Sequence, residues 1–596
     1  MINDKDKKVR IGCASAFYGD SQLSARQLVE KGNIDYLVFD YLAEVTMAIL
    51  SRAKAKDEQL GYAVDFVTVA MKDVLTDCAR QGIKVVANAG GVNVPGCIAA
   101  LEKLCDILQL DLKVAGVYGD DLLPRSTALA TGDMPEMQTG APLPNKLASM
   151  NAYLGAKPIA DALAAGADIV VTGRIVDSAV VLGPLMHEFG WQHAAYNRLA
   201  QGALAGHVIE CGAQCTGGNF TDWHLVPDFS NMSYPIAEIS ADGSFVIEIP
   251  QGTGGLVSIG TVAEQILYEI GDPANYLLPD VACDFSNVKL KQLGKDRVHV
   301  RGAVGRAPGE QYKVCATYVD GYRLIGTFFM GGLRCADKAR TSLEAWVKRT
   351  RDVFEKKGWE DYREVSIEII GAEATYGPHS RVQNTREVIG KCGLHHNSRE
   401  ALQFASQEMA YLATSAAPGL AGFGAGRARP SPLMRVHSCL IQKSQVPVKV
   451  QLGTEVIIEK CYDKDETSDM ALGIHYALDA TAPSEVLIDV PLETLAYARS
   501  GDKGNNANIG IIARKPEYLP YLYEQLTADA VAGYFAHTVK GQVERFDVPG
   551  VNGFNFLMTE ALGGGGTASL LVDSQGKALG QMLLSITISV PASLLL

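Results

Sequence analysis

Patterns that mark several well-known active sites are absent from this chain of 596 residues. It contains no GxxxxGK(S/T), HExxH, GxSxG or GxGxxG, which argues against a P-loop nucleotidase, a zinc protease, an α/β-hydrolase and a standard dinucleotide dehydrogenase. No apolar run approaches the roughly 18 residues that span a bilayer, and the charged start lacks the apolar segment of a signal peptide. We therefore expect a cytoplasmic protein that does not bind membranes.

Positive charge is also scarce. The chain has 54 lysines and arginines against 67 aspartates and glutamates, and its net charge of -13 disfavours nucleic acid and anionic membranes as partners. The twelve cysteines are scattered, and Cys211 and Cys215 have no second pair nearby to complete a zinc site. This usage is typical of reduced thiols rather than of a disulfide framework.

Length and patterning indicate several α/β domains. A chain of 596 residues is too long for one hydrophobic core. Over residues 1–222, apolar runs alternate with amphipathic helical segments, which predicts a parallel sheet covered on both faces. Residues 223–480 are interpreted as a mixed α/β region that continues this core, with alternating runs typical of antiparallel strands. Residues 485–596 are interpreted as a small α+β domain.

Polar residues gather where the predicted parallel strands end. Ligands bind at the carboxyl ends of the strands in such a sheet, so these residues are candidates for a site. The candidate acids and bases are Asp40, Glu44, Asp120 and Asp121. The candidate substrate-binding residues at this edge are Asn88, Gly90, Gly91, Asn93, Arg174 and Asp177. Helix capping is the alternative role for Asp121 and Asp177.

A glycine-rich polar run at residues 206–220 contains His207 and Glu210, three residues apart. On a helix the two side chains share a face, so His207 is a candidate base with Glu210 as its orienting partner. A single histidine is more often structural, and that alternative stays open.

The most polar run lies near the carboxyl end. Residues 499–508 combine an arginine, a lysine, an aspartate, three asparagines and two glycines between two apolar stretches. A charged glycine loop between strands exposes backbone N–H groups and a lysine to an anion. We expect substrate binding by Arg499, Ser500, Asp502, Lys503 and Asn505, and the alternative is a tight hairpin whose polar groups satisfy the turn. Four more glycines at 563–566 fit either a bare turn or a close approach of a ligand to the backbone.

Several of these stretches together resemble the acyclic terpene utilization protein A family. They include DYLVFDYLAE at 35–44, NAGGVN at 88–93, VTGR at 171–174, ECGAQ at 210–214, TGGNF at 216–220 and the run 499–514. The resemblance implies a carboxyl-terminal ferredoxin-like domain. It also implies a role in the bacterial breakdown of citronellol and geraniol, whose intermediates are branched acyl-CoA thioesters.

The hypothesis that follows is an enzyme that acts on a branched, carboxylated acyl-CoA by C–C cleavage or hydration, with CoA as part of the substrate. Both reactions need a base near the carbon α to the thioester and donors for the enolate oxygen. One alternative is a non-catalytic acyl-CoA-binding or scaffold protein of the same pathway. Another is a lyase in which Asp40, Glu44, Asp120 and Asp121 ligate Mg²⁺ or Mn²⁺. We also expect a homo-oligomer, because glycine-rich loops from separate domains suit sites completed across an interface.

Overall fold

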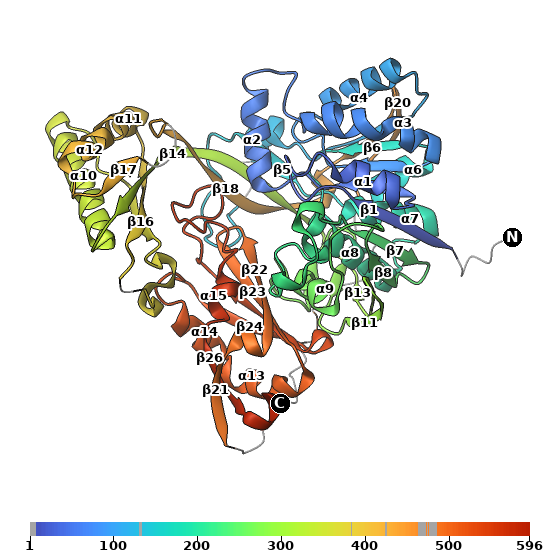
Figure 1. Ribbon diagram of the computed structural model, residues 1–596. Coiled ribbons are helices and arrows are strands. Elements are labelled where there is room, and N and C mark those ends of the chain that lie inside the picture. The colour runs from blue at the N-terminus through green and yellow to red at the C-terminus, as the bar shows by residue number, and fades with distance from the viewer. Residues whose placement is uncertain are drawn as a thin grey trace.

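The computed structural model describes residues 7–129, 134–382, 384–422, 426–462, 473, 475 and 486–595. Figure 1 shows three parts: an amino-terminal α/β part in blue to green, a smaller lobe in yellow, and a carboxyl-terminal domain in orange and red. The strands β14 (Gln311–Gly331) and β18 (Ser431–Gln442) run from the lobe to the centre of the molecule, as an arm between the parts.

Parallel strands form the centre of an 11-stranded sheet, as the alternation over residues 1–222 predicts. Their order is β1-β2-β3-β6-β4, and every neighbouring pair is parallel. Their bounds are Lys8–Cys13 for β1, Tyr36–Phe39 for β2, Lys84–Ala87 for β3, Val114–Tyr118 for β4 and Ile169–Thr172 for β6. All residues of β2 and β6 are buried, because helices cover both faces of the sheet.

Two groups of helices enclose this sheet, each with its own hydrophobic core. One core contains residues of α1 (Ser24–Lys31), α3 (Lys72–Gln81) and α4 (Val94–Leu108). The other contains residues of α6 (Lys157–Ala164), α7 (Ala179–Phe189) and α8 (Tyr196–Ile209). Leu37 and Val38 of β2 point into opposite cores, as the pleat of a strand requires.

Antiparallel strands from beyond residue 222 extend the sheet on both sides. Next to β1 lie, in outward order, β7 (Ile236–Ser240), β8 (Phe245–Glu248), β12 (Arg297–Arg301) and β11 (Lys289–Gly294). Next to β4 lie β19 (Val448–Leu452) and β20 (Glu455–Lys460). The parallel strands are therefore the middle of a larger mixed sheet. The domain boundaries at 222, 480 and 485 stay a prediction.

The strand β14 is 21 residues long and belongs to a six-stranded sheet. Its first half pairs with β18 and with β5 (Ser149–Ala152), and its second half pairs with β16 (Glu387–His396) and β17 (Leu420–Gly422). The lobe is completed by β15 (Glu364–Ile370), α10 (Cys335–Lys357) and α11 (Arg399–Glu408). The pairing of β14 with β18 is irregular between Val319 and Tyr322, where β14 enters the lobe.

Four antiparallel strands in the order β22-β23-β25-β24 form the sheet of the carboxyl-terminal domain. Their bounds are Ala496–Lys503 for β22, Asn506–Ala513 for β23, Val543–Val548 for β24 and Gly553–Met558 for β25. Their core includes residues of α13 (Leu519–Gln525), α14 (Ala528–Tyr534) and α15 (Leu579–Leu583). A separate pair, β21 (Leu487–Pro491) and β26 (Thr587–Pro591), joins the two ends of the domain.

The prediction of a loop at residues 499–508 is wrong. These residues form a tight hairpin, the alternative given above, in which β22 and β23 pair and Gly504 and Asn505 make the turn. Gly504 has a φ of 66°, a value that tight turns use and that glycine adopts readily. The polar side chains fit into strands because partners within the protein satisfy them. Asn508, for example, donates its amide to the carbonyl oxygen of Leu267 at 2.7 Å.

Two expectations about membranes and thiols can be compared with the structure. Within the described residues, no helix has both the length and the apolar character needed to cross a membrane. All twelve cysteines lie in the described part, and none of them is joined in a disulfide there. All of them except Cys211 and Cys461 are buried.

Candidate active site

A cavity of about 790 Å³ lies where the central sheet, the arm and the β22–β23 hairpin meet. Its volume is in the range of small-molecule sites. Charged side chains of all three parts line it, namely Glu44, Arg174, Asp177, Glu269, Glu310, Lys313, Asp502 and Lys503. Apolar side chains such as Val176, Leu278 and Leu440 line the remaining walls.

The predicted grouping of polar residues at the sheet edge is confirmed in position. Asp40, Asn88, Asp120 and Arg174 follow β2, β3, β4 and β6, which are neighbouring parallel strands with their carboxyl ends side by side. Of these four residues, Arg174 lines the cavity. The other three are buried and contact each other or the backbone.

Asp120 and Asp121 hold the backbone. Asp120 accepts hydrogen bonds from the backbone N–H of Arg174 at 2.8 Å and from the amide of Asn151 at 2.9 Å. Burial raises the pKa of Asp120 to about 7. Asp121 accepts from the backbone N–H of Leu123 at 3.0 Å, a local turn contact in front of a short helix whose N-cap is Leu122. Neither side chain lines the cavity, so the catalytic role expected for them has no support at this site.

Asn88 joins the ends of β2 and β3. Its Nδ2 donates to Oδ1 of Asp40 at 2.5 Å, and its Oδ1 accepts from the backbone N–H of Tyr41 at 2.7 Å. All of these atoms are buried. Asn88 therefore positions the carboxyl group of Asp40, and the expectation that it binds substrate stays a prediction.

Gly90, Gly91 and Asn93 form the turn into α4. Gly91 has a φ of 54°, and a Cβ atom there would lie 2.6 Å from the carbonyl oxygen of Gly61, so the position requires glycine. Asn93 caps α4 by accepting from the backbone N–H of Gly96 at 3.1 Å. None of the three lines the cavity, and the prediction that they bind substrate has no support here.

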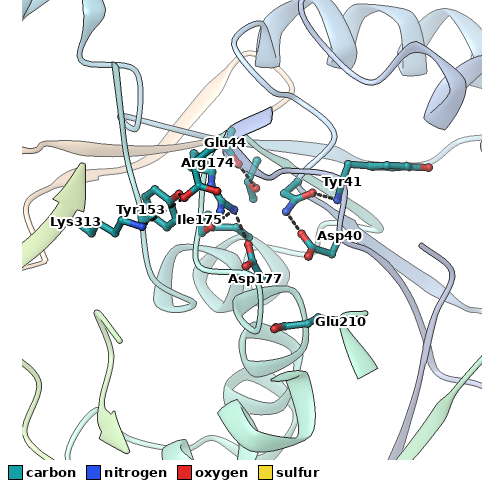
Figure 2. Close-up of polar contacts among 12 residues, drawn as sticks. Asp40, Tyr41, Glu44, Tyr153, Arg174, Ile175, Asp177, Glu210 and Lys313 are labelled. Carbon is teal, nitrogen blue, oxygen red and sulfur yellow. Dashed lines mark hydrogen bonds and ion pairs between the residues drawn. The ribbon is translucent and has the colours of Figure 1, made fainter. Parts of the chain in front are cut away.

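Arg174 and Glu44 belong to a charged network on the cavity wall, shown in Figure 2. Arg174 Nη1 donates to Oδ1 of Asp177 at 2.5 Å, and its guanidinium carbon lies 4.0 Å from the ring centre of Tyr153. The Tyr153 hydroxyl donates to Oε1 of Glu44 at 2.6 Å, and Lys313 Nζ lies 3.4 Å from the same oxygen. Two cations and two carboxylates therefore surround one aromatic ring.

This network keeps Glu44 ionised. Withdrawal from water acts to raise the pKa of Glu44, but Lys313, Arg174 and the hydrogen bond from Tyr153 outweigh it and lower the pKa below its usual value. Arg174 is buried, and its Nε has no hydrogen-bond partner within the described residues. A carboxylate beside a guanidinium with a spare donor can take a proton from a ligand and stabilise an oxygen that becomes negative.

Asp40 and Glu210 form a second, deeper pair of acids near Asp177 (Figure 2). Each is 6% exposed. Burial raises the pKa of both carboxyl groups well above the usual value, and the charge of Asp177 raises it further. The fold therefore favours the protonated form of both carboxyl groups. Glu210 Oε2 is buried without a hydrogen-bond partner in the described part of the chain.

His207 contacts Glu210, as the spacing predicts, but it does not line the cavity. Its Nδ1 lies 3.2 Å from Oε1 of Glu210, and its Nε2 lies 3.2 Å from the carbonyl oxygen of Ile266. Burial lowers the pKa of His207 to about 4, so the ring is neutral. A ring proton on Nε2 is donated to this carbonyl, which leaves Nδ1 as an acceptor that faces the carboxyl group of Glu210. The expected contact between His207 and Glu210 is present, and the catalytic role of His207 stays a prediction.

Lys503 and Asp502 reach the cavity from the end of β22. Lys503 Nζ donates to the carbonyl oxygen of Glu269 at 2.9 Å, and withdrawal from water and the positive Lys313 lower the pKa of Lys503. Lys577 Nζ lies 3.0 Å from Oδ1 of Asp502 and 2.7 Å from Oε1 of Glu269. Burial raises the pKa of Asp502 to about 6, although Lys577 acts to lower it. These contacts join the carboxyl-terminal domain to the rim of the cavity.

Arg499, Ser500 and Asn505 do not line the cavity. Arg499 Nη1 donates to the carbonyl oxygen of Asn219 at 2.7 Å. Ser500 is buried, and its hydroxyl donates to a backbone carbonyl oxygen at 2.6 Å. Asn505 Oδ1 accepts from the backbone N–H of Gly564 at 2.6 Å. The three residues hold the hairpin in place, and the expectation that they bind substrate is not supported.

Sequence reasoning misses eight polar or aromatic residues of the cavity, namely Tyr153, Glu269, Tyr276, Glu310, Gln311, Lys313, Gln442 and Gln575. Lys313 has a visible signal, because a lysine interrupts an otherwise apolar stretch of a strand. Glu269 has a φ of 55°, which is unusual for a residue other than glycine but leaves no trace in the sequence. The two tyrosines look like ordinary core residues.

The metal-dependent alternative lacks a ligand set in the described part of the chain. No three His, Cys, Asp or Glu side chains among these residues are arranged to hold a metal ion. The expected ligands Asp40, Glu44, Asp120 and Asp121 have the separate hydrogen-bond partners described above. The prediction that these four acids converge on one metal ion is therefore wrong.

Known protein families match both the amino-terminal part and the carboxyl-terminal domain of the chain. The family described as "Acyclic terpene utilisation family protein AtuA" matches residues 9–452, and the "AtuA ferredoxin-like domain" matches residues 490–589. The second match confirms the ferredoxin-like domain. No curated protein and no solved structure shows a significant match to the chain.

Proposed function

This chain belongs to the acyclic terpene utilisation family AtuA, and on that premise we propose that it is an enzyme acting on a branched, carboxylated acyl-CoA. Membership implies involvement in acyclic terpene utilisation. The finer proposal is C–C bond cleavage or hydration of the thioester. It rests on the contents of the cavity and not on the family match.

The observation that carries the proposal is the combination of cations and apolar walls in one cavity. Arg174, Lys313 and Lys503 supply positive charge for a carboxylate and for a thioester carbonyl. The apolar lining accommodates a branched hydrocarbon chain and comes from Val176, Leu277, Leu278, Pro279, Pro308 and Leu440. A cavity of about 790 Å³ is large enough for the acyl part of such a substrate.

Glu44 is the proposed base in either reaction. In cleavage it takes the proton of a β-hydroxyl group, the bond between the α and β carbons breaks, and its electron pair forms the enolate of the departing thioester. In hydration it takes a proton from water, the oxygen bonds to the β carbon, and the π electrons move onto the thioester as an enolate. Arg174 and Lys313 are the proposed donors to the enolate oxygen, whose α carbon then takes up a proton.

Turnover of branched, carboxylated CoA thioesters by the purified protein tests this proposal, with the thioester products separated by chromatography. Glu44→Gln should lower kcat by about 100-fold or more, the usual contribution of a general base. Asp121→Asn is the matched control, because Asp121 lies at the same sheet edge but outside the cavity, and it should leave kcat unchanged.

The same experiment separates the alternatives. Thioester binding without turnover would favour a non-catalytic acyl-CoA-binding or scaffold protein, and an absence of both binding and turnover would overturn the proposal. Loss of turnover with a chelator would revive a metal-dependent lyase with other ligands. The homo-oligomer is likewise a proposal, and light scattering at micromolar concentration tests it.

A further inference from the structure

The glycine turn at residues 563–566 exposes backbone beside the cavity. Gly563, Gly564 and Gly565 have φ values of 59°, 102° and 80°, which glycine adopts without strain. A Cβ atom at Gly565 would lie 2.5 Å from the carbonyl oxygen of Gly504, which lines the cavity. The turn is therefore built from glycine so that the backbone can come close to its neighbours.

Unbalanced positive charge surrounds this turn. Arg323 of β14 donates from Nη1 to the carbonyl oxygen of Thr567 at 3.1 Å, and no carboxylate pairs with Arg323 within the described residues. Arg435 of β18 donates from Nε to Oδ2 of Asp320 at 2.5 Å, and Arg363 pairs with the other oxygen of the same carboxylate. Two guanidinium groups thus share the carboxylate of Asp320 and Arg323 pairs with none among the described residues, in a chain whose net charge is -13.

The turn and the arginines meet each other and the cavity. A Cβ atom at Gly564 would lie 3.0 Å from Nη1 of Arg435, and one at Gly566 would lie 3.2 Å from the side chain of Gln575. Gln575 lines the cavity, as Gly504 does. The positive patch is therefore next to the cavity rim on the side of the carboxyl-terminal domain.

We propose that this patch, formed by the turn 563–566 with Arg323 and Arg435, binds the phosphate groups of the CoA moiety while the acyl end occupies the cavity. Guanidinium groups match phosphate oxygens in pairs, and side-chain-free backbone lets a bulky anion approach closely. The proposal rests on the proposed function for the identity of the ligand. The rival explanation is that the same contacts only attach the lobe to the carboxyl-terminal domain.

Calorimetric binding of CoA without an acyl group, and of inorganic pyrophosphate, tests the patch separately from the chemistry. Arg323→Gln should weaken CoA binding by about 10-fold or more, the expected effect of losing a charged hydrogen-bond donor. Arg323→Lys, which keeps the charge but not the paired donors, should fall between Arg323→Gln and the wild type. Binding of the free acyl carboxylate, which does not reach the patch, should be unchanged in both variants.

Arg381→Gln is the matched control. Arg381 also lies in the lobe, and its Nη2 donates to the carbonyl oxygen of Ser585 in the carboxyl-terminal domain at 3.5 Å. Wild-type affinity for CoA in Arg381→Gln with weakened affinity in Arg323→Gln supports the patch. Equal affinities in Arg323→Gln and wild type, or equal losses in both variants, overturn it. CoA binding that depends on Arg323 in a protein that turns over no thioester would retain the patch and reject the proposed reaction.

Discussion

Replacing Lys503 by alanine separates ligand binding from folding at the cavity rim. Among the described residues, the Nζ of Lys503 makes one hydrogen bond, to the carbonyl oxygen of Glu269 at 2.9 Å; the side chain is exposed at the cavity rim, although the neighbouring walls shield its charge enough to lower its pKa. Its loss leaves an oxygen that water can reach, so the free energy of unfolding should fall by no more than about 1 kcal/mol. The pKa of Lys503 is lowered in the fold, which means that the fold disfavours its charge and loses little without it.

Binding should respond much more strongly. A hydrogen bond from an ammonium group to a ligand carboxylate or phosphate contributes about 1.5–3 kcal/mol, which corresponds to a roughly 10- to 150-fold increase in Kd for Lys503→Ala. Calorimetry with a carboxylated CoA thioester gives the Kd, and thermal unfolding of the same sample gives the Tm. Unchanged Kd together with unchanged Tm would refute the assignment of Lys503 to the site. A large rise in Kd together with a large fall in Tm would show instead that Lys503 attaches the hairpin to Glu269.

The pH dependence of binding provides a second test of Lys503. Because its pKa is lowered, the ammonium group loses its proton at a lower pH than a free lysine does. Affinity for an anionic ligand should therefore decline as the pH rises through that lowered pKa. Lys503→Arg, which stays protonated, should remove the decline, and a decline that persists in this variant would assign it to another group.

Three further results are expected. Asp40→Asn should remove a loss of stability that the wild type shows as pH rises above about 4. The fold raises the pKa of Asp40 and so favours a proton that the unfolded chain releases. Urea midpoints at several pH values measure this loss, and parallel curves for the variant and the wild type would contradict the prediction. Arg514→Ala should lower the free energy of unfolding by about 3 kcal/mol, because it breaks a bidentate ion pair with Asp222 at 2.5 and 2.6 Å. Denaturant unfolding measures the change. A lysine cannot make the paired contact, so Arg514→Lys should restore little of the lost stability. Tyr153→Phe should move the acid limb of the pH profile of kcat/KM to higher pH, because it removes the hydrogen bond from Tyr153 that lowers the pKa of Glu44. An acid limb that does not move would exclude Glu44 as the base.

The sequence predicts the central fold well because periodicity reports burial directly. The alternating segments expected over residues 1–222 include the helix α1 and the buried strand β2. The position of Asp40 beside Arg174 also follows, since parallel strands place their carboxyl ends at one edge. What spacing cannot tell is whether such a residue contacts a ligand or the backbone. Asp120 is as polar as Glu44, but it bonds to a backbone N–H and does not line the cavity.

Residues brought together from distant parts of the chain are the second limit. Lys313 reaches the cavity only because β14 passes the sheet edge, and no local pattern contains that crossing. The hairpin at 499–508 fails for a different reason, since asparagines and a serine that suggest a loop are satisfied by partners far away in sequence. Local polarity therefore overestimates exposure wherever two domains share an interface.

The irregular pairing in β14 has a consequence for the modularity of this chain. The polypeptide enters the lobe on β14 and returns on β18, and the two strands are still paired at Tyr322 with Pro432 and at Arg323 with Ser431. The lobe is thus an insertion whose two connections are neighbours, so a short Asn-Gly turn would close the remaining ribbon into a hairpin. Such an excision would keep Lys313 and the sheet edge but delete Arg323. A single variant would therefore separate the part of the protein that contains the cavity from the lobe that we propose helps to bind the CoA end of the ligand.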